Sequence, residues 1–336
     1  MGTGPIFIGG PDRCGKTTLR AFLQTHENIS IPAVGSNMWT YFYGQYGDLS
    51  SPDNLERCLY DMLNYKHVRF LAPDIDLVRR EFAEGPATYA RLFAIFQKQH
   101  ARREGKPRWG DQTGLIERYA DQIFAAYPDA KIIHMLRDPR DRYAGSLALW
   151  PNGKGRVGGA TARWLYSTLL GERNLKKYPG RYMLVRFENM VRDPEQTVKA
   201  VCKFVNEPYH PTMLTMASAP EHRAKLAKRS TKPLKLHPLS DEYIGIYRRS
   251  VSRREIAFMQ GILGYLMKKY GYGLEPMFFS FKDMLAFLFI DWPLNLARMT
   301  AWLVVELLQH HMPTRFGRKP GENMVVNSTQ ATPKAS

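Results

Sequence analysis

The residues best placed for chemistry lie in a glycine-rich loop near the start of the chain. Residues 5–9 form an apolar run that predicts a short buried strand, and the residues after position 18 have the apolar spacing of a helix. Glycine lets the backbone approach an anion, and free N–H groups at a helix start donate hydrogen bonds to its oxygens. The loop therefore predicts a binding site for a phosphate or sulfate group. Its candidate binding residues are Arg13, Cys14, Gly15, Lys16, Thr17 and Thr18.

The loop alone leaves the identity of the anion open. The spacing from Gly10 to Thr17 fits G-x-x-x-x-G-K-S/T, the loop that binds nucleoside triphosphates. Arg13 or Lys16 would add a full positive charge for any other anionic nucleotide. The helix terminus predicts a lowered pKa for Cys14, but no nearby residue supplies a base. We therefore interpret Cys14 as a small loop residue and not as a nucleophile.

Composition favours an anionic partner, and the length fits one large α/β domain as well as two domains. The 336 residues carry 48 Lys and Arg against 31 Asp and Glu, a net charge of +17. A hydrophobic content of 44% is enough for a substantial core. Three widely spaced cysteines argue against a disulfide framework and fit a reducing compartment. The first residues lack a basic stretch followed by an apolar run, so we expect a cytoplasmic protein without a secretory signal.

Alternating strand and helix patterns predict an α/β fold with a parallel sheet flanked by helices on both faces. Apolar runs predict strands at residues 5–9, 130–136 and 181–187. The intervening residues, including 52–103 and 194–205, have mostly helical patterns. In such sheets ligands bind beyond the carboxyl ends of the strands, so the glycine-rich loop and Arg137 should lie on the same edge. We place this P-loop-like domain at residues 1–275.

The C-terminal part predicts a helical extension and then disorder. Residues 277–309 are strongly apolar, but charged residues interrupt them, so no uncharged run is long enough to span a membrane. We expect residues 276–312 to form a helical hairpin that packs on the domain or on a second subunit. The alternative is a helix at a membrane interface, which the basic charge would support. Residues 313–336 are expected to be disordered.

At the level of motifs the chain resembles the sulfotransferase superfamily, which uses 3′-phosphoadenosine 5′-phosphosulfate (PAPS) as donor. Members have a P-x-K/R-S-G-T/S-T loop after the first strand, which residues 11–18 resemble with Arg13 in the basic position. They also have a strand that ends in R-D/N-P-x-D, which residues 137–141 match. The resemblance spans residues 4–273 in order. Its other parts are Trp109-Gly110-Asp111-x-Thr113, residues 185–194, and Tyr243-Ile244-Gly245 with Arg248-Arg249.

The resemblance implies transfer of a sulfuryl group from PAPS to an acceptor hydroxyl or amine, without a metal. PAPS is anionic at both ends, so it needs two positive sites: Arg13 and Lys16 suit the phosphosulfate, and Arg137 suits the 3′-phosphate. The family's 3′-phosphate serine corresponds to Gly145, with Ser146 next to it. Arg13 and Lys16 are also expected to stabilise the charge that builds on the leaving nucleotide.

A base should accept the proton of the acceptor group. Asp111 is the first candidate, in a segment of turn-forming residues (107–117) that we interpret as a bridge between helices. A structural turn cap is an equally good interpretation of Asp111. His67 and His134 are weaker candidates. His134 lies in a predicted core strand.

Two other functions are compatible with parts of the sequence. A triphosphate-dependent kinase would need an acid at a strand end for Mg²⁺, and Asp138 is the only plausible one; its neighbours Arg137 and Pro139 suit an anion site better. A nucleic-acid binder could use the basic residues 221–254, but it would leave the strand-end motifs unexplained. We therefore expect no nucleic-acid partner. Residues 221–254 form either a solvated basic face or a lid that closes on the anion. Sugars, lipids, peptides, and small phenols or alcohols all remain as acceptors.

Overall fold

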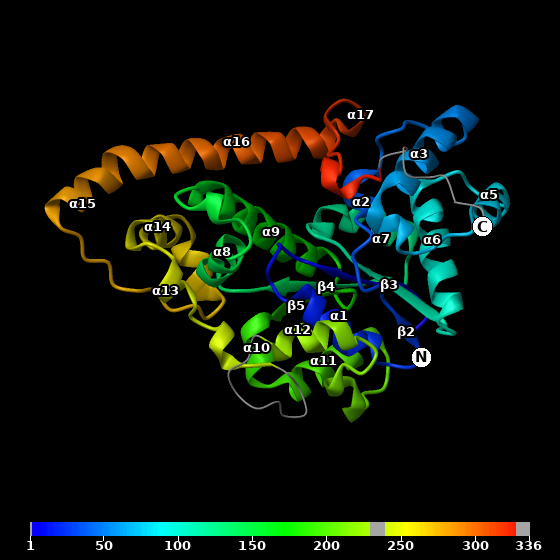
Figure 1. Ribbon diagram of the computed structural model, residues 1–336, viewed down its shortest axis with the longest axis horizontal. Helices are drawn as coiled ribbons and strands as arrows, with labels where there is room; N and C mark the ends of the chain where they lie inside the picture. The colour runs from blue at the N-terminus through cyan, green and yellow to red at the C-terminus, as the bar shows by residue number, and fades with distance from the viewer. Residues whose placement is uncertain (1, 229–238, 327–336) are drawn as a thin grey trace, which may run out of the picture.

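The computed structural model describes residues 2–228 and 239–326. At the centre of this part of the chain is a five-stranded sheet in the order β2-β3-β1-β4-β5, with every neighbouring pair parallel (Figure 1). Ile6 of the central strand pairs with Gly110 on one side and with Lys131 on the other. The predicted α/β class is confirmed. The strands are β1 (Ile6–Gly9), β2 (Ile29–Ser30), β3 (Arg108–Gln112), β4 (Lys131–Leu136) and β5 (Tyr182–Arg186).

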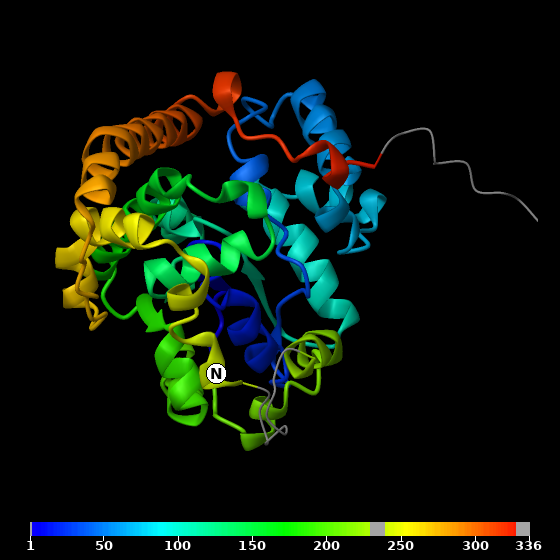
Figure 2. The ribbon, with the colours of Figure 1, turned by 60° about the vertical axis from the view of Figure 1, so that its left-hand side comes forward.

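Helices cover both faces of the sheet, as the alternating pattern predicts (Figures 1 and 2). Side chains alternate along β1, so Ile6 and Ile8 enter the core on one face while Phe7 enters the core on the other. The first face is covered by α1 (Lys16–Gln24), α10 (Phe187–Arg192), α11 (Pro194–Val205) and α12 (Pro220–Ala227). The second face is covered by α6 (Tyr89–Arg103), α7 (Ala120–Ala126) and α9 (Val157–Lys177).

The remaining helices form two further groups, one beside β3 and one beyond the carboxyl end of β4. On the β3 side, α2 (Met38–Tyr41), α3 (Pro52–Asn64), α4 (Lys66–Arg69) and α5 (Ile75–Ala83) pack into the core above Phe7. Beyond β4 lie α8 (Pro139–Leu147), α13 (Tyr247–Ser250) and α14 (Arg253–Lys269). The short 3₁₀ helices are Ile116–Tyr119, Pro151–Gly153, Pro211–Thr215, Asp241–Tyr243 and Glu322–Met324.

The prediction that residues 107–117 form a turn-rich bridge is wrong, because β3 occupies Arg108–Gln112 between β1 and β2. All five residues of β3 are buried, although few of them are apolar. The Arg108 guanidinium is satisfied by remote partners: it donates to the carbonyl of Gly4 and pairs with Glu207 at 3.1 Å. Gly110 is needed because a Cβ there would lie 2.5 Å from the carbonyl oxygen of Ile6. A buried strand of mostly polar residues has no alternation of apolar and polar residues, so the sequence pattern did not predict β3.

The C-terminal extension is one bent helical segment, which differs from the predicted hairpin. It consists of α15 (Phe281–Ala286), a π-helical turn η5 (Phe287–Asp291) and α16 (Trp292–His311). Pro293 does not reverse the chain. It lies just after the π-helical turn, and a proline and a π-helical turn are both typical causes of a bend in a helix that continues. The segment runs along α9 as an outer layer (Figures 1 and 2). No helix in residues 2–228 and 239–326 is both long enough and apolar enough to cross a membrane.

A buried ion pair fastens α16 to the body of the protein. Glu306 pairs with Arg118, and both side chains are only 1% exposed. The second oxygen of Glu306 accepts a hydrogen bond of 2.8 Å from Arg318, which follows α16. The chain after α16 was expected to be disordered, but up to Val326 it instead forms α17 (Pro313–Phe316) and returns to α3. There Val326 N–H donates to the carbonyl of Asn64 at 2.8 Å.

Replacing Glu306 with alanine should strongly destabilise the packing of α16. The substitution leaves the Arg118 guanidinium buried without its carboxylate, which costs about 3–5 kcal/mol in comparable pairs. Urea unfolding, with hydrogen exchange measured across α16, would report the loss. Glu195→Ala is the control, because Glu195 pairs with Lys199 at 2.8 Å on the exposed surface and should matter little. Equal effects of the two substitutions would contradict the assigned role of the buried pair.

Candidate nucleotide-binding and active site

The glycine-rich loop joins β1 to α1 through three residues with positive φ. These are Gly10 (φ 103°), Arg13 (φ 64°) and Gly15 (φ 89°). At Gly15 a side chain would also clash with the ring of Phe187, so glycine is required both for its backbone conformation and for space. No side chain caps the start of α1. The N–H groups of its first turn are therefore available for an anion.

A cavity of about 520 Å³ lies over this loop, at the carboxyl ends of β1 and β4. The loop contributes its floor, and α8, α10, α12 and residues 239–246 contribute its walls. The polar lining side chains are those of Arg13, Lys16, Thr17, Thr18, Arg137, His222, Lys225 and Tyr243. The apolar lining side chains are those of Ala148, Leu149, Phe187, Leu226, Leu239 and Ile246. The cavity is therefore cationic with an apolar wall.

Arg137 extends from the end of β4 toward the loop. One terminal nitrogen donates to the carbonyl of Arg13 at 3.0 Å, and the other donates to the carbonyl of Tyr243 at 2.6 Å. Its guanidinium lies 4.4 Å from the ring centroid of Phe187, which fixes the plane of the group. Gly145 lies between the two arginines, because a Cβ there would be 3.5 Å from Nε of Arg13 and 3.8 Å from Nη1 of Arg137. The two predicted cationic positions thus share one cavity.

Lys16 is turned back toward its own loop. Its Nζ donates to the carbonyls of Gly10 at 2.7 Å and Pro11 at 2.5 Å. Burial lowers the pKa of Lys16, because the charged form loses solvation. The ammonium group therefore clamps the loop while its side chain also lines the cavity.

Cys14 and Ser146 do not face the cavity. The Cys14 thiol is buried in the core, and burial raises its pKa to about 11. The pKa lowering predicted from the helix terminus is wrong, because desolvation of the thiolate outweighs the helix dipole and the nearby cations. The Ser146 hydroxyl donates to Asp12 at 3.2 Å, on the other side of α8 from Gly145.

Asp12 was not identified from the sequence, yet it anchors the loop. Its carboxylate accepts from Arg142 of α8 at 2.5 Å and from Arg163 of α9 at 2.9 Å. Burial alone would raise the pKa of Asp12, but the two arginines hold it well below its usual range. The loop is therefore tied to α8 and α9 through one ionised carboxylate.

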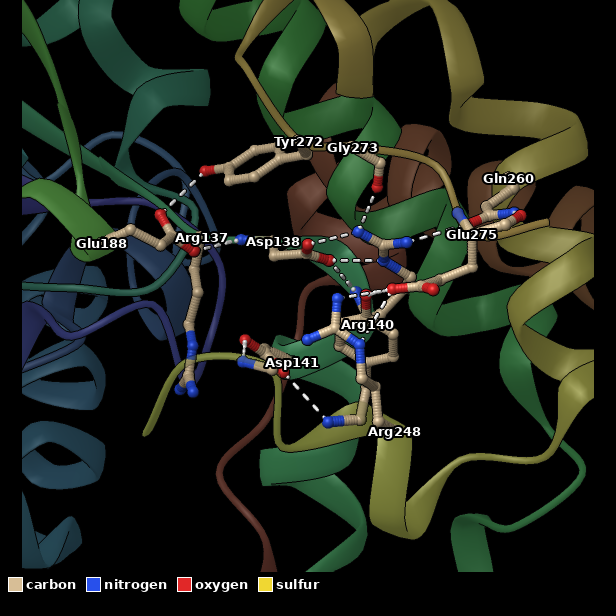
Figure 3. Close-up of polar contacts among 12 residues, drawn as sticks. Arg137, Asp138, Arg140, Asp141, Glu188, Arg248, Gln260, Tyr272, Gly273 and Glu275 are labelled. Carbon is tan, nitrogen blue, oxygen red and sulfur yellow. Dashed lines mark hydrogen bonds and ion pairs between the residues drawn. The ribbon is translucent and has the colours of Figure 1, made fainter. Parts of the chain in front are cut away.

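The acids of the motif at residues 137–141 are engaged in structural contacts (Figure 3). Both oxygens of Asp138 bind Arg140: Oδ1 accepts from its Nε at 3.0 Å, and Oδ2 accepts from its Nη2 at 2.7 Å. Asp141 accepts hydrogen bonds from the backbone N–H groups of Gly245 at 2.7 Å and Tyr247 at 3.0 Å. Asp138, the acid that a kinase would need for Mg²⁺, is thus held by Arg140, and Figure 3 shows Arg137 extending away from it.

A metal site was not predicted, and within the described ranges no three or more His, Cys, Asp or Glu residues are grouped to hold a metal ion.

Asp111 lies in β3 and not in a turn between helices, which corrects the predicted location. It is 1% exposed and is not a lining residue of the cavity. Its oxygens accept from the N–H and hydroxyl of Ser36 at 3.0 and 2.5 Å and from the hydroxyl of Thr113 at 3.0 Å. Burial raises the pKa of Asp111 to about 6, against the opposing effect of these hydrogen bonds.

The two histidine candidates also lie outside the cavity. Nδ1 of His67 is 2.7 Å from the carbonyl oxygen of Gly35, and burial lowers the pKa of this ring. His134 is fully buried in β4, where it contacts the hydroxyl of Tyr182 at 2.7 Å and that of Ser167 at 3.1 Å. The structure therefore brings together Arg13, Lys16 and Arg137, but not the three candidate bases.

The basic residues 221–254 contribute two cavity residues that sequence reasoning did not single out. His222 and Lys225 lie one turn apart on α12, and Nε2 of His222 is 3.2 Å from the hydroxyl of Thr18. Their position agrees with an anion-facing role for the first part of this segment. Residues 229–238 lie outside the described residues, so the predicted lid is not tested. The abundance of basic residues in 221–254 was the sequence signal for a cationic surface, but it did not show which of these residues would line the cavity.

The raised pKa of Asp111 predicts a specific pH dependence of stability. The folded protein holds this proton up to about pH 6, whereas an unfolded aspartate loses it near pH 4. The folded state thus binds more protons in this window, and its stability falls as the pH rises from about 4 to about 6, by roughly 3 kcal/mol. Asp111→Asn should remove this dependence, which urea unfolding across the window would measure. Parallel stability curves for the two proteins would contradict it.

Comparisons with known proteins agree with this architecture. The sulfotransferase domain of the olefin synthase from Synechococcus PCC 7002 has the same fold: 20% identity, TM-score 0.54, and coverage of 81% of this chain and 95% of that chain. The sulfotransferase domain of the curacin biosynthetic pathway is 19% identical, with TM-score 0.49 and coverage of 81% and 99%. No curated protein sequence matches significantly. A model of the sulfotransferase family matches residues 5–211. The chain therefore belongs to the sulfotransferase family.

Proposed function

We propose that this sulfotransferase uses PAPS as donor and transfers its sulfuryl group in line to an acceptor hydroxyl or amine. The observation that carries the proposal is the position of Arg137, whose guanidinium lines the same cavity as the loop and donates to the carbonyl of Arg13 at 3.0 Å. PAPS carries a phosphosulfate and a separate phosphate on one adenosine. A cavity lined by a positive loop and by a further arginine from a neighbouring strand suits such a ligand.

The lining residues can be divided between the parts of the donor. The first-turn N–H groups of α1, with Thr17, Thr18 and Lys16, would bind the phosphosulfate. Arg137 would bind the 3′-phosphate, because its planar guanidinium can contact two oxygens of one phosphate. Phe187 and its apolar neighbours offer a surface for the adenine ring. Gly145, which has no side chain, leaves room between Arg13 and Arg137.

The reaction breaks the bond between sulfur and the bridging oxygen of the 5′-phosphate and forms a bond between sulfur and the acceptor atom. The acceptor loses its proton, and 3′-phosphoadenosine 5′-phosphate (PAP) leaves. Negative charge develops on the bridging oxygen, where Lys16 and Arg13 would stabilise it. Lys16 would exchange its hydrogen bonds to the carbonyls of Gly10 and Pro11 for contacts with the anion. Its ammonium group has already lost its water in the folded loop, so binding the anion adds no further desolvation of Lys16.

Asp111 stays a proposed base. A pKa of about 6 suits a proton acceptor near neutral pH. Its carboxylate would have to give up the hydroxyl of Ser36, its contact at 2.5 Å, to reach an acceptor group.

PAP without metal should stabilise the protein, because a ligand that binds only the folded state raises its unfolding temperature. We expect the same shift with EDTA present, and little shift with ATP and Mg²⁺. Thermal unfolding with each ligand gives the comparison. A shift with ATP and Mg²⁺ that PAP does not produce would favour the kinase.

Arg137→Ala should weaken PAP binding by about 1.5–3 kcal/mol, roughly ten- to hundredfold in Kd, because it removes charged hydrogen bonds to a phosphate. Titration calorimetry would measure the affinity, and thermal unfolding would show whether the variant is folded. Arg57→Ala is the matched control, since this exposed arginine of α3 contacts only Asn54 among the contacts the structure shows. Unchanged affinity in folded Arg137→Ala would remove Arg137 from the site.

A further inference from the structure

The outward side of the C-terminal helical segment is mostly apolar. We call this surface the outer face of α15–α16 (Figure 2). Some of its side chains are more than half exposed, such as Phe289 at 73% and Ile290 at 61%. Soluble proteins rarely expose a large contiguous apolar patch that has no partner. The face consists of Leu285, Leu288, Phe289, Ile290, Leu294, Leu296, Val304, Val305, Leu307 and Leu308.

Four polar residues of the same segment point toward the protein. Asp291 pairs with Arg254 of α14 at 3.2 Å, and the side chain of Asn295 accepts from the backbone N–H of Gly158 at 3.0 Å. Farther along, Arg298 donates to the carbonyl of Gly155 at 2.6 Å. Glu306 completes the series in its buried pair with Arg118.

This arrangement differs from that of an ordinary surface helix, which packs one apolar stripe on the core and presents charge to water. The inner side of the segment packs Trp292 on Phe258 and Trp302 on Tyr166, beside the polar contacts. A second apolar side is left facing out. Each of these inward polar groups has a partner on the body of the protein, so the orientation is specified by several separate contacts. An exposed apolar face of this size points to an apolar partner.

We propose that the outer face docks on an anionic membrane surface, with α16 lying parallel to the lipid plane. The polar contacts to α9 and α14 hold the helix against the body, so it would enter the interface sideways. Charge supports this partner: exposed Lys282 lies at the start of the segment, and exposed Arg315 and Lys319 follow its end. Basic residues beside an apolar helix face attract anionic headgroups, and the net charge of +17 acts in the same direction.

The width of the face favours lipid over a second copy of the chain. Consecutive residues 288–290, and the pairs 304–305 and 307–308, are exposed together, so the apolar arc is broad. A helix pair buries a narrower seam with a period of about 3.5 residues. Two of the three acids in the segment, Asp291 and Glu306, point inward to arginines. Asp283 is exposed at the start of α15, beside exposed Lys282, and accepts a hydrogen bond from the hydroxyl of Ser280.

Flotation of the full chain with vesicles tests the proposal. The vesicles are phosphatidylcholine alone, and phosphatidylcholine and phosphatidylglycerol in equal parts. We expect binding to the anionic vesicles and at least about tenfold weaker binding to the neutral ones. Phe289→Glu with Val305→Glu should lower binding to the anionic vesicles at least about tenfold. The control, Tyr60→Glu with Phe70→Glu, makes the same charge change at exposed aromatic positions on α3 and after α4 and should leave binding unchanged.

Thermal unfolding and size-exclusion chromatography of the same proteins make the result decisive. The substituted side chains are exposed, so both variants should unfold at the wild-type temperature and keep their metal-independent shift with PAP. The proposal is overturned if the wild type binds neither vesicle or if the α15–α16 variant binds as well as the control. It is also overturned if the wild type is a dimer that this variant converts to a monomer without any vesicle binding, because a second copy would then cover the face. If PAP does not raise the unfolding temperature of the wild type, that result counts against PAPS as the donor and not against membrane binding.

Discussion

The site depends on keeping several positive charges in one cavity without neutralising them. The structure separates its carboxylates from these charges. Asp12 is bound by Arg142 and Arg163, and Asp138 is bound by Arg140. Arg137 and Lys16, which line the cavity, instead donate to backbone carbonyls among the described residues. A neutral carbonyl orients a cation but does not cancel its charge, so an anion can replace it at little electrostatic cost. The arginines outside the cavity thus leave its cations available.

The same use of buried charge shapes the C-terminal segment. Glu306 is not at the site, yet its pair with Arg118 fixes which side of α16 meets α9. Hydrophobic contact alone would not select this orientation, because the inner side, with Trp292 on Phe258 and Trp302 on Tyr166, and the outer side are both apolar. Buried ion pairs are often weak contributors to net stability, but removal of one partner is costly, so they can specify an orientation. Here the specified orientation is the one that leaves Phe289 and its neighbours outward.

Local sequence signals predicted the parts of the molecule that local contacts build. The apolar runs of β1, β4 and β5 and the glycine-rich loop are each one continuous stretch of the chain. Their local sequence patterns were therefore enough to predict them. In contrast, β3 was missed because Arg108 is satisfied by Glu207, almost a hundred residues away. His222 entered the cavity only because α12 packs beside α1, a contact that no local spacing reveals. The hairpin predicted for residues 276–312 was wrong, because the chain continues from α15 through a π-helical turn into α16 without reversing.

Lys16 shows why a loop spacing does not by itself define a reaction. The spacing from Gly10 to Thr17 matches a triphosphate loop, and the geometry of β1, loop and α1 is also suitable for one. Metal-dependent phosphoryl transfer further needs an acid that can contact Mg²⁺ beside the phosphates. Asp138 occupies the corresponding strand end, but Arg140 binds both of its oxygens in a largely buried pair. Opening that pair would leave Arg140 without a counter-charge in the interior, a cost of several kcal/mol. The preceding residue, Arg137, lines the cavity and reaches the loop, so this strand end presents a cation to the cavity while its acid is bound by Arg140.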